Sequence, residues 1–187
     1  MARSPRVTSS LLAAALFYGG HLLALVLLAG TAWVLGRLLL GSLPLASGWE
    51  KVGLPGALGI AGLAHLAFLL GLAHGLSRPA LLLVLAAIHA AGWRRGIWGD
   101  LPRRAAPLLT QGGGTRPRVA VAALGALLLG LPLFVLALYP PTAFDATLYH
   151  LPDARAFARA GALPFLQELR FPVFPQLDEA LFAAVLL

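Results

Sequence analysis

Long apolar stretches broken by short polar ones set the pattern of this chain. Apolar residues run over about 11–40, 54–76, 79–93 and 119–139, and a last run covers 180–187. About 20 apolar residues in a helix cross the hydrocarbon layer of a membrane. The pattern therefore predicts about four complete transmembrane helices and the start of a fifth span. We expect the chain to be the N-terminal part of a longer protein.

Two polar stretches separate these runs most clearly. Residues 94–118 carry six Arg and a Gly triplet, which favour a flexible basic loop. Residues 140–179 hold five of the seven acidic residues. Under the positive-inside rule the basic loop lies in the cytoplasm, and 140–179 then lies outside. Helix parity places the N-terminus outside as well, although Arg3 and Arg6 oppose that placement.

Composition agrees with an all-α, polytopic integral membrane protein. The chain is 59% hydrophobic and 11% charged, whereas about a quarter of the residues of a soluble domain are charged. The net charge of +7 comes from arginines in short runs between apolar stretches, so it orients helices and predicts no nucleic-acid partner. The first run is about twice the length of a signal-peptide core, so we interpret it as a retained helix. The absence of cysteine excludes thiol catalysis and thiolate metal sites.

The stretch YPPTAFDATLYHLPDARAFARAG, residues 139–161, places ionisable side chains just beyond an apolar run. Asp145 is a competent helix N-cap and the final glycine is a suitable C-terminal stop. We therefore predict an amphipathic helix on the outer membrane surface, kinked or restarted at Pro152. If the segment is helical throughout, Asp145, Tyr149 and Asp153 share one face. A carboxylate held there can meet the headgroup of a lipid-linked substrate.

Each candidate residue also has a plainer interpretation. Asp145 could serve only as an N-cap, and Asp153 could belong to a solvated helix face. Tyr149 and His150 could be interfacial residues at the level of the lipid headgroups. The adjacent acids Asp178 and Glu179 are expected to cap the fifth helix.

Two segments, PPTAFDATLYHLPDARAFARAGALPF and FPVFPQLDEALFAAVLL, resemble the first outer loop of bacterial GT-C glycosyltransferases. These are the membrane enzymes of the protein mannosyltransferase and aminoarabinose-transferase type, family 39, and the resemblance covers about 45 of the 187 residues. The shared pattern is an acid after a membrane helix, an aromatic residue four positions on, a small-residue helix ending in Gly, and a proline-containing re-entry. These positions are Asp145, Tyr149, Gly161 and Phe174-Pro175. The chain departs from the pattern in having Ala146 where many members carry a second acid, and four apolar runs before the loop.

The resemblance implies a glycosyltransferase of the bacterial cytoplasmic membrane. It would move a sugar from a polyprenyl-phosphate donor to an acceptor on the outer face, with Asp145 as the catalytic base or acceptor-site carboxylate. We add Tyr149, His150 and Asp153 as substrate-binding candidates. The expected partners are the lipid-linked donor and membrane lipids. No metal site or certain cofactor is predicted, a divalent metal stays open, and the chain alone is expected to be inactive.

A non-catalytic transporter or channel component is the alternative function. Such proteins carry broken helices or paired charges at mid-membrane depth. The apolar runs here hold no charge pair, only His21, His65, His74 and His89. Their spacing provides no metal site, so we expect neutral histidines that hydrogen-bond between helices. The enzyme is therefore the favoured interpretation.

Overall fold

The structure, a computed structural model, describes residues 5–45, 48–99, 144–167 and 176–187, with a few helical positions between 124 and 135. All regular structure in these ranges is helical, which confirms the all-α class for the described part of the chain. The elements are α1 (Pro5–Leu40), α2 (Gly48–Leu72), α3 (Arg78–Arg94), the π-helix η1 (Ala146–His150), α6 (Leu151–Ala160) and α7 (Leu177–Leu186).

Two of these helices are long and apolar enough to cross a membrane. They are α1, over Leu12–Leu40, and α2, over Glu50–Leu72. The third predicted span, α3, has 17 residues, fewer than the roughly 20 that a bilayer requires. The predicted fourth span, 119–139, and the re-entry at Phe174–Pro175 lie mostly outside the described residues. Two helices therefore qualify as candidate membrane spans by length and composition. The total of about four complete spans stays a prediction.

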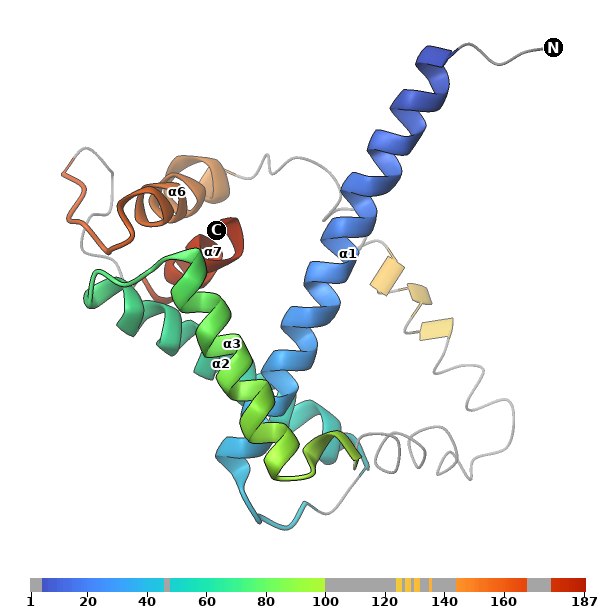
Figure 1. Cartoon of the computed structure of the whole chain (residues 1–187), viewed down its shortest axis with the longest axis vertical. Helices are drawn as coiled ribbons and strands as arrows, with labels where there is room; N and C mark the ends of the chain where they lie inside the picture. Colours follow the sequence, from blue (N-terminus) through green and yellow to red (C-terminus); the bar gives the residue numbers. More distant parts are fainter. Residues whose placement is uncertain are drawn as a thin grey trace.

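The N-terminal half of α1 projects away from the other helices (Figure 1). Its large apolar side chains are exposed, as Leu16, Leu23 and Val26 illustrate. Contiguous exposed apolar surface of this kind is unfavourable in water and marks a surface that contacts lipid or protein. The C-terminal half is different, because Thr31, Ala32, Trp33, Val34 and Leu35 are all buried.

Glycines allow α1 and α2 to approach closely at this buried end. A Cβ atom at Gly36 would overlap the carbonyl oxygen of Pro55, and one at Gly59 would overlap the carbonyl oxygen of Ala32. Small residues at such crossings let helix backbones touch, which is the usual basis of helix association in membranes. Gly59 therefore serves the packing of α2 against α1.

The segment after residue 144 packs on the opposite end of α2. The Leu76 N–H donates to the Gly161 carbonyl at 3.0 Å, and the Leu163 N–H donates to the Gly71 carbonyl at 3.2 Å. These bonds join the end of α6 to the turn between α2 and α3. A shared apolar core then forms from α2, α6 and α7, with Ala67, Leu76, Ala154, Phe157, Ala180 and Ala183 buried in it.

The predicted helix at 145–161 forms, but with a different start and a change of register. Asp145 has helical dihedral angles and makes no capping bond, so the N-cap prediction is wrong. The helix widens into η1, where the Leu151 N–H donates to the Ala146 carbonyl five residues earlier. Pro152 lies in the first turn of α6 and brings no N–H, so a π-helical turn precedes it rather than a kink. Gly161 ends α6 in the left-handed conformation at φ +62°, as predicted.

Candidate functional site

An ion pair between two distant segments forms the centre of the candidate site. His150, at the end of η1, donates from Nδ1 to Oε1 of Glu179, in the first turn of α7, at 2.6 Å. The Glu179 side chain is 2% exposed, whereas the His150 side chain is 31% exposed. A proton on Nδ1 suits this contact, because an ionised carboxylate only accepts hydrogen bonds. Glu179 therefore fixes the orientation of the imidazole from the protein interior.

A second carboxylate, that of Asp153, is buried beside this pair. Asp153 is 2% exposed, so it is not the solvated helix face of the plainer interpretation. Burial raises the pKa of Asp153 above its ordinary value, the negative charge of Glu179 raises it further, and His150 opposes both. One oxygen of each carboxylate, Oδ1 of Asp153 and Oε2 of Glu179, has no hydrogen-bond partner among the described residues. His150 is thus hydrogen-bonded to Glu179 and interacts with Asp153 through charge.

Tyr149 links this pair to Asp145 at the surface. Partial burial, the charge of Asp145 and a hydrogen bond with Asp145 all raise the pKa of Tyr149, and Glu179 adds to the effect. The Tyr149 ring lies 4.2 Å from the His150 ring, centroid to centroid. The predicted i, i+4 contact of Asp145 with Tyr149 is therefore present. Asp153 does not continue that face, because the π-helical turn places it with His150 and Glu179 instead.

An open cleft of about 400 Å³ adjoins the exposed edge of His150. It is lined by Ala146, His150, Leu151, Asp178 and Phe182. Asp178 is exposed in the first turn of α7, whereas its neighbour Glu179 is turned inward. The cleft therefore has a charged wall from α7 and a histidine wall from η1. A polar substrate could reach the imidazole through this opening.

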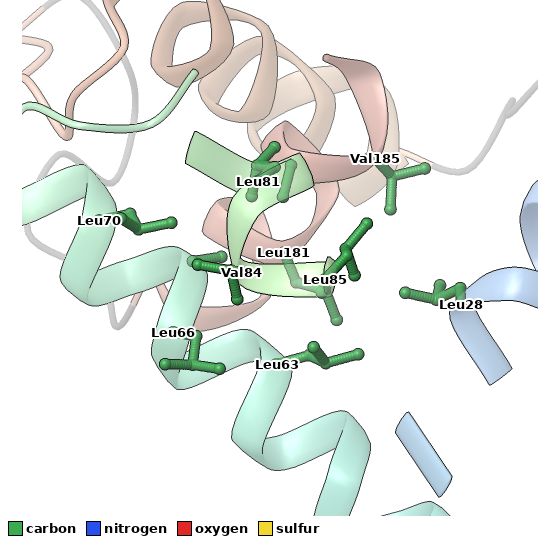
Figure 2. Close-up of a pocket in the computed structure, with 11 residues that line it drawn as sticks. Leu28, Leu63, Leu66, Leu70, Leu81, Val84, Leu85, Leu181 and Val185 are labelled. Atoms are coloured by element: carbon green, nitrogen blue, oxygen red, sulfur yellow. The ribbon is translucent and has the colours of Figure 1, made fainter. Parts of the chain in front are cut away.

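A separate apolar cavity lies on the other side of α7, between α1, α2, α3 and α7 (Figure 2). Its volume is about 90 Å³, and its lining includes Leu28, Leu63, Leu66, Leu81, Val84 and Leu181. The lining residues contain no ionisable group, so this cavity contributes no chemistry to the candidate site. Nor do the described residues contain three or more metal-binding side chains arranged to hold a metal ion.

The four other histidines behave in different ways. His89 donates or accepts a hydrogen bond across helices, from Nε2 to the buried Thr31 hydroxyl at 3.0 Å, as expected. His21 and His65 instead each bond at 2.7 Å to the carbonyl four residues earlier in their own helix. Both are exposed, and no other helix among the described residues offers them a partner. His74 lies in the turn after α2 with φ +56°, outside any described helix.

Glu179 is the site residue that sequence reasoning missed. It was expected to cap the fifth helix, but it is buried and bonded to His150, which corrects that expectation. A usable signal was present in the pair Asp178-Glu179. Adjacent residues on a helix point about 100° apart, so two neighbouring acids beside an apolar stripe cannot both face water equally. The pattern alone did not say which of them turns inward.

Comparison of the chain with protein-family models, with curated proteins and with solved structures finds no match. The candidate site thus consists of an exposed carboxylate, a tyrosine, a histidine and two buried carboxylates, on η1, α6 and the start of α7.

Proposed function

We propose that the protein is a membrane glycosyltransferase that moves a sugar from a polyprenyl-phosphate-linked donor to an acceptor on the outer face of the bacterial cytoplasmic membrane. One observation carries the proposal. The exposed carboxylate of Asp145 hydrogen-bonds Tyr149, and the next residue, His150, is bonded to Glu179 and lines an open cleft. These residues belong to the segment that resembles the outer loop of GT-C enzymes.

The proposed reaction requires one base and no nucleotide. An acceptor hydroxyl oxygen attacks the anomeric carbon of the sugar, and the bond between that carbon and the phosphate oxygen breaks. The lipid phosphate leaves with the electron pair, and the acceptor proton passes to the Asp145 carboxylate. Asp145 is exposed, so a substrate can reach it without rearrangement of the core.

His150 is the second functional group in this proposal. Its Nδ1 is bonded to Glu179, so Nε2 is the ring nitrogen that remains to meet a substrate, and His150 lines the cleft. A charged imidazole there would donate to an oxygen of the sugar or of the phosphate. Glu179 acts through His150, as a positioning residue, because a carboxylate that is hydrogen-bonded to one ring nitrogen fixes the orientation of the other.

The decisive variant is Asp145→Asn in the complete gene product. Asn keeps the size of the side chain, and Asp145 makes no capping bond that could be lost. We expect the protein to fold and insert normally and to lose sugar transfer by roughly 10²-fold or more, as for removal of a general base. The measurement is transfer from a polyprenyl-phosphate sugar by purified protein, with expression matched.

Asp178→Asn is the matched control. Asp178 is also an exposed carboxylate, and it lines the cleft beside His150, but no described interaction joins it to Tyr149 or His150. Its variant should retain most of the activity. Near-normal transfer by Asp145→Asn would remove Asp145 from the chemistry and with it the proposed mechanism.

A further inference from the structure

Two buried carboxyl groups lie where α6 packs against α7 (Figure 1). Asp153, in the first turn of α6, and Glu179, in the first turn of α7, are each 2% exposed. Each directly precedes a fully buried alanine, Ala154 or Ala180, in the core that the two helices share. Small side chains at these positions let the helices approach closely. Asp153 does not line the open cleft, so the proposed sugar transfer leaves it without a role.

The charges around these two carboxyl groups do not balance if both groups are ionised. Glu179 and His150 are the charged groups that act on Asp153 in the described part of the chain. His150 is hydrogen-bonded to Glu179 at 2.6 Å, and even a protonated imidazole offsets only one negative charge. Arg155 and Arg159, on the same helix as Asp153, are exposed. An unbalanced buried carboxylate is costly, so one of the two carboxyl groups takes up a proton.

Unpartnered oxygens on both carboxyl groups indicate where that proton lies. Oδ1 of Asp153 and Oε2 of Glu179 are buried and have no hydrogen-bond partner among the described residues. Two ionised carboxylates cannot satisfy each other, because both only accept hydrogen bonds, whereas a protonated carboxyl group donates one. Glu179 already accepts from His150 through Oε1, which favours the ionised form of Glu179. Burial raises the pKa of Asp153, and the charge of Glu179 raises it further, which agrees with a proton on Asp153.

We propose that Asp153 is a positioning residue, which in its protonated form donates a hydrogen bond to Oε2 of Glu179. The Glu179 carboxylate is then held through both oxygens, one bonded to Asp153 and the other to His150. A carboxylate held at two points fixes the imidazole ring, and with it the direction of the remaining ring nitrogen, Nε2. Asp153 therefore acts through Glu179 and His150 and touches no substrate. Its effect on sugar transfer rests on the proposed function, whereas the shared proton does not.

Infrared difference spectroscopy of the purified protein in detergent tests the proton directly, because a protonated carboxyl group has a carbonyl stretch that a carboxylate lacks. At about pH 5.5, where exposed aspartates are mostly ionised, Asp153→Asn should remove one such band. Glu179→Gln should shift the band or remove it, since a charged acceptor is lost. Asp178→Asn, at an exposed carboxylate, is the matched control and should leave the band in place. The absence of any band that depends on Asp153, or a band that Glu179→Gln leaves unchanged, would overturn the proposal.

Sugar transfer tests the positioning role with two replacements that keep the branched shape of the side chain, compared at equal concentrations of folded protein. Asp153→Asn keeps a donor for Oε2 of Glu179, its amide group, so transfer should stay close to that of the unaltered protein. Asp153→Leu suits the apolar core but offers no donor, and transfer should fall by about tenfold or more. Equal activity of these two variants would overturn the positioning role. An unaltered protein without transfer activity would count against the proposed function instead, and the infrared bands would still decide whether the proton is shared.

Discussion

Asp153 shows how one residue couples burial to protonation. A carboxylate that is 2% exposed loses its hydration, and Glu179 adds a second negative charge nearby, so the pKa of Asp153 is raised. His150 opposes the shift but does not cancel it. The native state holds this proton more tightly than the unfolded state does. Asp153 therefore costs no stability at pH values below its ordinary pKa of 3.8. The free energy of unfolding falls as the pH rises from there through the raised native pKa of Asp153.

Asp153→Asn should remove this loss of stability. The amide carries no titrating proton, so the variant should match the unaltered protein at about pH 4 and melt at a higher temperature at about pH 7.5. The measurement is the melting temperature in detergent at both pH values. Asp178→Asn is the control, since Asp178 is exposed and exposed charges contribute little. A constant difference between Asp153→Asn and the unaltered protein at both pH values would contradict the desolvation argument.

His150 illustrates a second point at the residue scale. Its identity and position suggested a role, but the sequence offered no partner for it. The partner, Glu179, lies 29 residues away, and a hydrogen bond of 2.6 Å to a buried carboxylate now distinguishes His150 from a merely interfacial histidine. Tyr149 and Asp145 are different, because their contact is local and follows from helical spacing.

At the scale of elements, the contact between α1 and α2 depends on glycines at a few positions. Gly59, on α2, faces the backbone of Ala32 with no room for a methyl group, whereas Gly30, two residues before Ala32 on α1, has nothing within 4 Å of its Cβ position. Identical substitutions at these two sites therefore separate packing from helix propensity.

Gly59→Ala should destabilise the protein by about 1–3 kcal/mol, because the helices must separate to admit the methyl group. Gly30→Ala should be neutral or stabilise by up to about 1 kcal/mol, through better helix propensity alone. Unfolding of the purified protein by increasing denaturing detergent measures both. Equal stabilities of the two variants would show that the close crossing of α1 and α2 does not form in the membrane.

The segment from η1 to α6 shows a related limit at the element scale. The sequence predicts a helix that is kinked or restarted at Pro152. The helix is present, and it restarts as α6 at Leu151, one residue before Pro152. The sequence does not reveal that the break takes the form of a π-helical turn, which rotates Asp153 away from Asp145 and Tyr149. Such turns occur often at functional sites, and this one places Asp153 beside His150 and Glu179.

At the scale of the whole molecule, the two ends of the helical bundle differ in charge. One end carries Arg37, Arg94 and Arg95, and the other carries the acids Asp153, Asp178 and Glu179 together with Arg155 and Arg159. Arginine accumulates on the cytoplasmic side of membrane proteins. We therefore expect the loop between α1 and α2 to face the cytoplasm and the candidate site to face outward.

Single cysteines test this orientation directly, because the chain has no cysteine of its own. Leu43, between α1 and α2, and Gln167, after α6, are both exposed. In intact cells, Leu43→Cys should resist a thiol reagent that cannot cross membranes, and Gln167→Cys should react. Both should react after the membrane is permeabilised. The reverse pattern in intact cells would place the candidate site in the cytoplasm and would exclude a donor that is used on the outer face.

The sequence by itself determined the helical class, the two long apolar helices and the segment in which Asp145, Tyr149 and His150 lie. These properties are sums over neighbouring residues, since hydropathy and helical periodicity depend on local spacing. Only the tertiary structure decided that Glu179 turns inward to His150 and that Asp153 is buried. Each of these depends on where segments far apart in the chain come together, and that is set by close packing at Gly59, Gly92 and the core around Phe157. No local pattern encodes such contacts, because a side chain acquires its partner only when another helix reaches it.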